Sequence, residues 1–169
     1  MPPRIYLAGF DVFRRDAIAR GDDLKQLCRA QGLQGLYPFD NQVPAQSTPE
    51  QTARLICQQN LQMIRDCDAV LANLNDFRGL EPDSGTAFEV GMAVALGKPV
   101  WAWFDAAATL RQQVPHDPEG RDAEGFLVED FNLPRNLMLA CTWAGHSRSA
   151  EEALPRLAAY LAQNQAPSV

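Results

Sequence analysis

The chain has 169 residues, of which 46% are hydrophobic and 21% are charged, and its formal net charge is −6. This composition is typical of one globular domain that buries a full core, so we expect a single domain over residues 1–169. An acidic chain without a run of Lys or Arg is a poor candidate for a nucleic-acid or membrane surface. No apolar stretch is long enough for a signal peptide or a membrane span. The sequence therefore predicts a cytoplasmic protein that binds neither nucleic acid nor membrane.

Metal and cofactor chemistry is not expected from the residue pattern. The four cysteines contain no CxxC pair, and His116 and His146 stand alone in loop-like sequence. Metal sites need ligands at set spacings, and cytosolic cysteines without them are most often reduced core residues. The sequence therefore predicts no metal ligand and no bound cofactor.

Five segments predict strands, and helical segments alternate with them. Strands are expected at residues 4–8, 35–38, 69–74, 99–104 and 138–143. Helices are expected at residues 11–30, 48–66, 82–96 and 149–162. Thr48 before Pro49 predicts a helix start, Gly97 predicts a helix end, and Ser149 is the expected cap of the last helix. This alternation predicts a flavodoxin-like, doubly wound parallel sheet in the strand order 2-1-3-4-5, with helices on both faces.

A sheet with this order binds ligands at the carboxyl ends of its strands, at the switch point between strands 1 and 3. The rule selects the loops at residues 9–13 and 75–83, and the loop after Phe104. Residues 105–135 form the longest stretch without a regular pattern, and we expect them to fold over the site. The turn after strand 1 contains Gly9 and Phe10 but lacks the further glycines of a dinucleotide-binding fingerprint, so a classical dinucleotide site is not expected.

Residues 83–91 (DSGTAFEVG) place two carboxylates around a glycine at the start of the third helix. Glu89 lies among apolar residues, and a carboxylate buried without a partner is costly and often functional. Side chains in a helix lean toward its N-terminus, so Glu89 would lie over Gly85, which leaves space for a ligand. The alternatives are that Asp83 only caps the helix and that Glu89 pairs with a cation such as Arg78.

The chain resembles the nucleoside 2-deoxyribosyltransferases over about residues 4–143. The central stretch carries the likeness, from Asn60 through residues 68–74, 77–79 and 81–86 to residues 89–91 and 97–100. Tyr6 in the first strand and residues 136–138 (NLM) after the long loop match two further family elements. The resemblance implies a flavodoxin-like fold, and cleavage of the N-glycosidic bond of a 2′-deoxynucleoside with transfer of the deoxyribosyl group to another free nucleobase.

The resemblance also implies a role for each matched residue. Glu89 is the nucleophile that attacks the anomeric carbon, Tyr6 orients it, and Asp83 holds the sugar 5′-hydroxyl. Asn60 stands where some family members have an Asp that contacts the base, a departure that leaves the general acid open. Asn136 and Met138 are expected to complete the site of a neighbouring subunit, which implies a homo-oligomer. Gly9, Phe10, Gly85 and Arg78 complete the expected substrate site.

Without the resemblance, Tyr6 is equally well a core aromatic at a strand end and Asn136 a turn residue. For Arg78, structural pairing with the acids is preferred to substrate contact. Two alternative functions also remain. One is an N-glycoside hydrolase of deoxynucleosides or their 5′-monophosphates, and the other is a non-catalytic nucleotide sensor. Transfer and hydrolysis differ in whether water reaches the glycosyl intermediate, which the sequence does not show.

Overall fold

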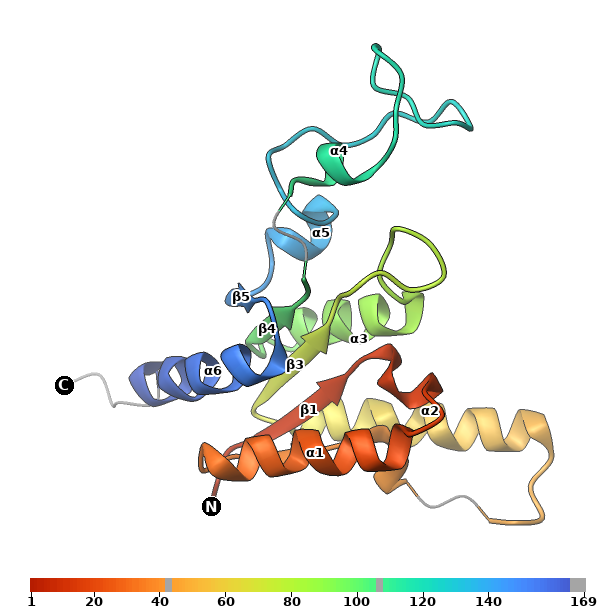
Figure 1. The fold of residues 1–169 in the computed structure, drawn as a ribbon. Coiled ribbons are helices and arrows are strands. Elements are labelled where there is room, and N and C mark those ends of the chain that lie inside the picture. The colour runs from red at the N-terminus through yellow and green to blue at the C-terminus, as the bar shows by residue number, and fades with distance from the viewer. Residues whose placement is uncertain (42–43, 106–107, 165–169) are drawn as a thin grey trace.

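A computed structural model describes residues 1–41, 44–105 and 108–164 of the chain, which form a five-stranded parallel sheet flanked by helices (Figure 1). The strands are β1 (Arg4–Ala8), β2 (Gln34–Leu36), β3 (Ala69–Asn73), β4 (Val100–Trp103) and β5 (Gly145–Ser147). The helices are α1 (Ala17–Ala30), α2 (Pro49–Asp66), α3 (Ser84–Ala95), α4 (Leu110–Gln113), α5 (Leu137–Ala140) and α6 (Ala150–Asn164).

The strand order is β2-β1-β3-β4-β5, and every neighbouring pair is parallel, which confirms the expected topology. The register places Tyr6 beside Val70 and Ala8 beside Ala72. In this order the connection after β1 leads to β2 on one side of the sheet, and the connection after β3 leads to β4 on the other side. The turn after β1 and the loop after β3 meet at the carboxyl edge of the sheet, where such folds bind ligands.

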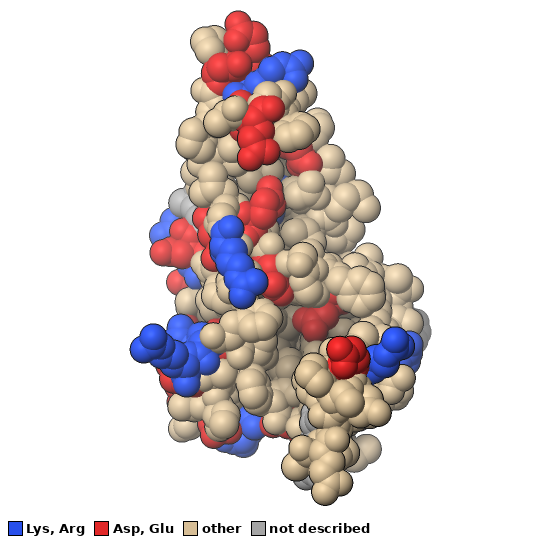
Figure 2. Space-filling model, turned by 90° about the vertical axis from the view of Figure 1, so that its right-hand side faces the viewer, with Lys and Arg blue, Asp and Glu red and all other residues tan. Residues whose placement is uncertain are grey.

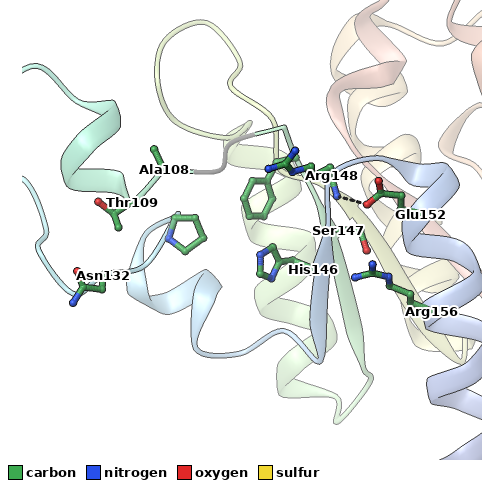
Figure 3. A pocket seen from close by; sticks show the side chains of 10 residues that line it. Ala108, Thr109, Asn132, His146, Ser147, Arg148, Glu152 and Arg156 are labelled. Atoms are coloured by element: carbon green, nitrogen blue, oxygen red, sulfur yellow. Dashed lines mark hydrogen bonds between the residues drawn. The ribbon is translucent and has the colours of Figure 1, made fainter.

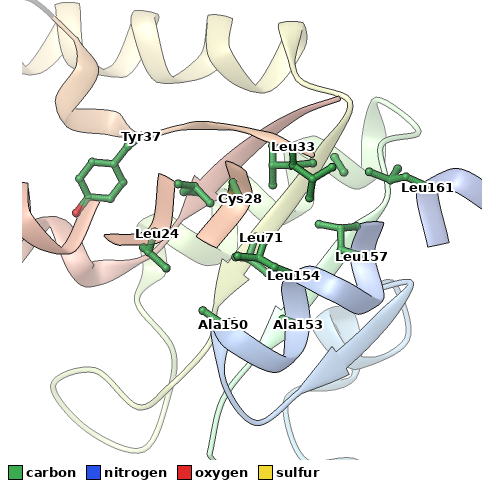
Figure 4. Packing of buried hydrophobic residues seen from close by; sticks show 13 residues of the cluster. Leu24, Cys28, Leu33, Tyr37, Leu71, Ala150, Ala153, Leu154, Leu157 and Leu161 are labelled. Atoms are coloured by element: carbon green, nitrogen blue, oxygen red, sulfur yellow. The ribbon is translucent and has the colours of Figure 1, made fainter. Parts of the chain in front are cut away.

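Two apolar clusters cover the two faces of the sheet. On one face, α1 and α6 pack against β1 and β3 through Leu24, Leu71 and Leu154, as Figure 4 shows. On the other face, Val90 of α3 packs in one cluster with Tyr6 of β1. Successive strand residues point to opposite faces, so Tyr6 must face α2 and α3 if its neighbours face α1 and α6. This alternation places the Tyr6 ring on the same side of the sheet as Glu89.

The prediction of a last strand at residues 138–143 is wrong. The segment forms the short helix α5, capped by Asn136, whose side-chain oxygen accepts a hydrogen bond from the Met138 amide at 3.0 Å. The edge strand β5 follows it at Gly145–Ser147. An apolar run of this length fits a buried strand or a helix equally well, and here the local cap favours the helix.

The first expected helix is interrupted. Phe10–Phe13 forms a 3-10 turn, and α1 begins only at Ala17. Phe13 and Ile18, both within the expected helix at residues 11–30, are exposed. The Asp11 carboxylate is buried instead: Oδ2 accepts a hydrogen bond from Asn73 at 2.7 Å, and Oδ1 pairs with Arg20 at 3.2 Å. This buried polar contact holds the turn after β1 against the end of β3.

The expected helix boundaries elsewhere agree with the structure to within about two residues. Thr48 caps α2 with a reciprocal pair of hydrogen bonds to Gln51, and Ser149 accepts a hydrogen bond from the Glu152 amide. Gly97 follows α3 with φ of 68°, a conformation that suits glycine. None of the helices in the described ranges combines the length and the apolarity that crossing a bilayer requires.

The long segment between β4 and α5 is partly ordered. It contains α4 and an antiparallel bridge between Arg121 and Leu127, while residues 106 and 107 lie outside the described residues. Figure 1 shows residues 114–132 as an arm that projects beyond α4 and α5, away from α1 and α2. The arm does not fold over the switch point of its own chain, contrary to the expectation from the sequence.

Candidate active site

Tyr6 and Glu89, 83 residues apart, meet at the carboxyl edge of the sheet. The Tyr6 hydroxyl donates a hydrogen bond of 2.6 Å to Oε1 of Glu89. Tyr6 is fully buried, so its ring is fixed by the core and its hydroxyl holds the carboxylate in one position. Oε2 of Glu89 accepts no hydrogen bond from the described residues, and Glu89 lines a cavity. Oε2 is therefore the oxygen that can meet a ligand.

Burial controls the protonation of both groups. Burial raises the pKa of Glu89 from 4.5 to about 7; the Tyr6 hydrogen bond opposes this shift, and the negative charge of Asp83 adds to it. Burial, followed by the charge of Glu89, raises the pKa of Tyr6 well above its usual value. At neutral pH the phenol therefore remains a neutral donor, and the carboxylate titrates near the physiological range.

This arrangement predicts the pH dependence of activity if ionised Glu89 is the reacting group. Below pH 7 the carboxyl is protonated, so kcat/KM should rise with pH and level off above about pH 7. Tyr6→Phe removes the hydrogen bond that lowers the Glu89 pKa, so the rising limb should move to higher pH. The measurement is kcat/KM from pH 4.5 to 9.5, with Tyr160→Phe as the control. A Tyr6→Phe profile identical to that of the wild type would contradict the assignment.

The Asp83 carboxylate caps α3 with one oxygen and leaves the other oxygen available to a ligand. It is the N-cap of α3, and its Oδ2 accepts hydrogen bonds from the Thr86 amide at 2.9 Å and the Thr86 hydroxyl at 3.0 Å. Oδ1 accepts none from the described residues, so capping leaves one oxygen free. Gly85 lies beside it, and a Cβ there would stand 3.0 Å from Asp83 Oδ2. Glycine therefore keeps the space around this carboxylate open.

The cavity has a volume of about 650 Å³, within the range typical of small-molecule sites. Five of the expected site residues line it. They are Gly9, Asn60, Asp83, Gly85 and Glu89. At Gly9 a side chain would clash, because a Cβ would stand 2.7 Å from the Cβ of Asn73. The Asn60 side-chain oxygen accepts a hydrogen bond of 2.7 Å from Asn41, which fixes its amide at the cavity wall.

Sequence reasoning missed the apolar wall of the cavity. Phe13, Phe39 and Ile56 line it together with Val12, Pro38 and Asn41. The signal that could have found it is the position of two aromatics: Phe13 ends the loop at residues 9–13 that the switch-point rule selected, although it was also counted in the expected helix at residues 11–30, and Phe39 lies in the turn directly after β2. Trp101, Trp103 and Phe104, in and just after β4, do not line the cavity.

Phe10 and Arg78 were expected to contact the substrate, and both instead contact aromatic rings of the protein. Phe10 stacks on Phe77 with ring centroids 4.9 Å apart. The Arg78 guanidinium lies over Phe77 and Phe13, 4.7 and 5.6 Å from the ring centroids, and it forms no ion pair with an acid in the described ranges. The predicted ion pair of Arg78 with Asp83 or Glu89 is therefore wrong. Arg78 instead borders the cavity through Phe13.

Asn136 and Met138 lie outside this cavity. They line a separate groove of about 520 Å³ between α3 and α5, and Met138 is largely exposed. Glu129 fixes the segment: it accepts hydrogen bonds from the Asn136 side chain and from the Leu137 amide, the latter at 2.9 Å. The Glu129 carboxylate therefore anchors Asn136.

Another cavity, of about 670 Å³, lies at the carboxyl ends of β4 and β5 (Figure 3). His146, Arg148 and Arg156 line it, and its one carboxylate, Glu152, accepts a hydrogen bond from the Arg148 amide at 3.3 Å. It contains no pair of acids comparable to Asp83 and Glu89. Among the described residues, no three His, Cys, Asp or Glu side chains form a cluster that could hold a metal ion.

The model of the nucleoside 2-deoxyribosyltransferase family matches residues 5–138. The chain belongs to this family. It is 34% identical to the 2-desoxiribosyltransferase from Leishmania mexicana, with a TM-score of 0.77, over 94% of this chain and 99% of the other. It is also 39% identical to an uncharacterized protein of Schizosaccharomyces pombe, over 80% of this chain and 74% of that protein.

A more distant member shares the fold. The 2-deoxyribosyltransferase from Bacillus psychrosaccharolyticus has 21% sequence identity and a TM-score of 0.60, and the match covers 88% of each chain. The resemblance expected from the sequence is thus confirmed at the level of family and fold.

Proposed function

We propose that this member of the nucleoside 2-deoxyribosyltransferase family transfers the deoxyribosyl group of a 2′-deoxynucleoside to another purine or pyrimidine base. The observation that carries this proposal is the Glu89 carboxylate, which the Tyr6 hydroxyl holds at the wall of a largely apolar cavity. A fixed carboxylate with one free oxygen suits attack on an anomeric carbon, and the deoxyribosyl centre passes through an oxocarbenium-like state that a carboxylate stabilises.

The reaction proceeds in two displacements. Oε2 of Glu89 forms a bond to the anomeric carbon while the bond from that carbon to the base nitrogen breaks, and the leaving base takes up a proton. A nitrogen of the second base then attacks the same carbon, releases the Glu89 carboxylate and loses its own proton. Two inversions retain the configuration of the sugar, as in retaining glycosidases.

The apolar wall supports binding of the base. Phe13 and Phe39 present aromatic surface to the cavity, and an aromatic ring binds the flat face of either base class. Asn60 carries an amide where a general acid could otherwise stand. An amide can donate a hydrogen bond to the base but supplies no proton, so protonation of the leaving base falls to another group or to water.

The second candidate is an N-glycoside hydrolase on the same scaffold. It uses the same first displacement, and water replaces the second base. The test is to incubate the protein with deoxyinosine, with and without adenine, and to follow free hypoxanthine and deoxyadenosine by chromatography. Deoxyadenosine that forms only with adenine supports transfer. Hypoxanthine release that adenine does not change, without deoxyadenosine, supports hydrolysis. Inosine as substrate should react much more slowly, because its 2′-hydroxyl destabilises the oxocarbenium-like state.

Asp83 is proposed to accept a hydrogen bond from the sugar 5′-hydroxyl through Oδ1. A 5′-phosphate at that place would meet like-charge repulsion, so deoxynucleosides should outperform their 5′-monophosphates. Asp83→Ser keeps a capping hydroxyl for α3 and removes the charge. It should lower kcat/KM for deoxyinosine and narrow the discrimination against deoxyinosine monophosphate by about tenfold or more. A wild type that prefers the monophosphate would contradict this substrate class.

Asn136 and Met138 are proposed to complete the site of a neighbouring subunit. In their own chain they face the groove between α3 and α5 and not the Glu89 cavity. A site built across an isologous interface requires a symmetric oligomer, with a dimer as the smallest unit.

A further inference from the structure

The cavity at the carboxyl ends of β4 and β5, here called the arginine cavity, carries an excess of positive charge. Arg148, Arg156 and His146 line it, and Glu152 is the one acid among its lining residues. Neither guanidinium forms an ion pair or a hydrogen bond with the part of the chain that the structure describes. Two such arginines in a concave site favour a phosphate ligand, because the guanidinium fork matches the spacing of phosphate oxygens.

The arginine cavity differs in charge from the rest of the molecule. The formal net charge of the chain is −6. Figure 2 shows a face on which acids extend from the upper, projecting part to the hollow below it, with cations interspersed among them. The charged side chains that line the Glu89 cavity are the two carboxylates of Asp83 and Glu89, which repel an anion. An anionic ligand is therefore favoured in the arginine cavity over the Glu89 cavity.

Ser147 places a hydrogen-bond donor inside the arginine cavity. It is only 4% exposed, and its Oγ accepts a hydrogen bond of 3.0 Å from the indole nitrogen of Trp101. Its hydroxyl proton points away from that donor and has no acceptor among the described residues. Figure 3 shows the Arg156 side chain directed toward Ser147, with Arg148 above both in that view. A phosphate oxygen beside Ser147 would accept hydrogen bonds from its hydroxyl and from Arg156.

His146 offers a flat surface in the same cavity. Its ring is nearly parallel to that of Phe104, with an interplanar angle of 6° and centroids 5.4 Å apart. The centroid of Trp143 lies 5.3 Å from His146 and 5.6 Å from Phe104. Because these three distances are nearly equal, the two aromatics cannot lie on opposite faces of the imidazole, and His146 is exposed. One face of its ring is therefore open to a planar group such as a nucleobase.

We propose that the arginine cavity binds a nucleoside 5′-monophosphate at a second site, separate from the Glu89 cavity. Arg148, Arg156 and the Ser147 hydroxyl bind the phosphate, and the base stacks on His146. The volume of about 670 Å³ leaves room for a nucleoside beside the phosphate. No lining residue is common to the two cavities. The binding does not rest on the proposed function, because it uses none of the residues that surround Glu89.

Isothermal titration calorimetry tests the site with deoxyinosine 5′-monophosphate as the probe. Glu89→Gln is the background, so that the probe is not cleaved. Arg148→Gln/Arg156→Gln should weaken binding by about tenfold or more, because it removes both cations from the phosphate. The matched control is Arg29→Gln/Arg65→Gln, which changes two exposed arginines of α1 and α2 and should have no effect.

A change in the other cavity shows which site the probe occupies. Phe39→Ala alters the wall of the Glu89 cavity and should leave the affinity for the probe unchanged. Absence of binding, binding that survives the loss of both arginines, or an equal loss in Phe39→Ala would overturn the second site. Base release from deoxyinosine, measured separately, bears on the Glu89 cavity alone, so the proposed function and this site can fail independently.

Inorganic phosphate separates the contribution of the phosphate from that of the nucleoside. It should bind more weakly than the monophosphate by about tenfold or more, because it makes no stacking contact. His146→Ala should weaken binding of the monophosphate and leave that of phosphate unchanged, and His146→Phe, which keeps a ring, should restore it. Melting temperatures confirm that each variant is folded. Equal affinities for phosphate and the monophosphate would overturn the nucleotide as the ligand.

Discussion

Glu89→Gln should reduce kcat for base release from deoxyinosine by about three orders of magnitude or more, because it removes the attacking oxygen. Gln keeps an oxygen that accepts the Tyr6 hydrogen bond, so the cavity should retain its shape. The measurement is single-turnover release of hypoxanthine, with Glu151→Gln as a surface control. Trapping with a 2′-fluoro-arabinosyl nucleoside should label Glu89 in the wild type. A rate near that of the wild type in Glu89→Gln would sink the assignment.

Stability gives an independent measure of the same residue. The folded-state pKa of Glu89 is raised from 4.5 to about 7, so the folded protein holds this proton more tightly than the unfolded chain. The resulting stability is fully present below about pH 4.5 and is lost as pH rises through about 7. Glu89→Gln has no such loss. Relative to wild type, it should gain up to about 3 kcal/mol between pH 4 and pH 8. Urea unfolding at both pH values measures the difference.

Mixed oligomers should recover activity that neither parent has. Glu89→Ala and Asn136→Ala should each be nearly inactive as homo-oligomers. In a hybrid dimer with shared sites, one site carries both lesions and the other carries neither, so up to half of the wild-type activity per dimer should return. Native mass spectrometry identifies the hybrids. No recovery in confirmed hybrids would mean that each site is built from one chain.

Glu129 provides a matched variant for this experiment, because it anchors Asn136 and the Leu137 amide. Glu129→Ala should lower activity as a homo-oligomer and regain it with Glu89→Ala. It should not regain it with Asn136→Ala, because in those hybrids both sites carry a lesion of the same segment. Recovery in the second mixture would show that Glu129 and Asn136 act in different sites. Glu151→Ala, mixed with either parent, is the control.

The expected fold depended on local patterns that tertiary contacts did not override. Short apolar runs alternating with capped helices predicted β1, β3 and β4 and the strand order. The edge of the sheet next to β4 was less predictable, because an apolar run of six residues does not distinguish a strand from a helix. Residues 138–143 were predicted as the last strand, but they form part of α5 and a turn. The tip of the arm was equally out of reach, because its shape depends on contacts such as that between Arg111 and Val128.

The sequence by itself determined the family and the pair of acids, because residues 83–91 keep Asp83, Gly85 and Glu89 at fixed positions on one helix. Only the tertiary structure decided what surrounds them. The hydrogen bond from Tyr6 to Glu89 joins residues 83 positions apart, and it exists because strand alternation turns Tyr6 toward α3. The wall of Phe13, Phe39 and Ile56 comes from three separate segments. Spacing along a chain specifies one helix or strand, whereas a cavity depends on how several of them pack.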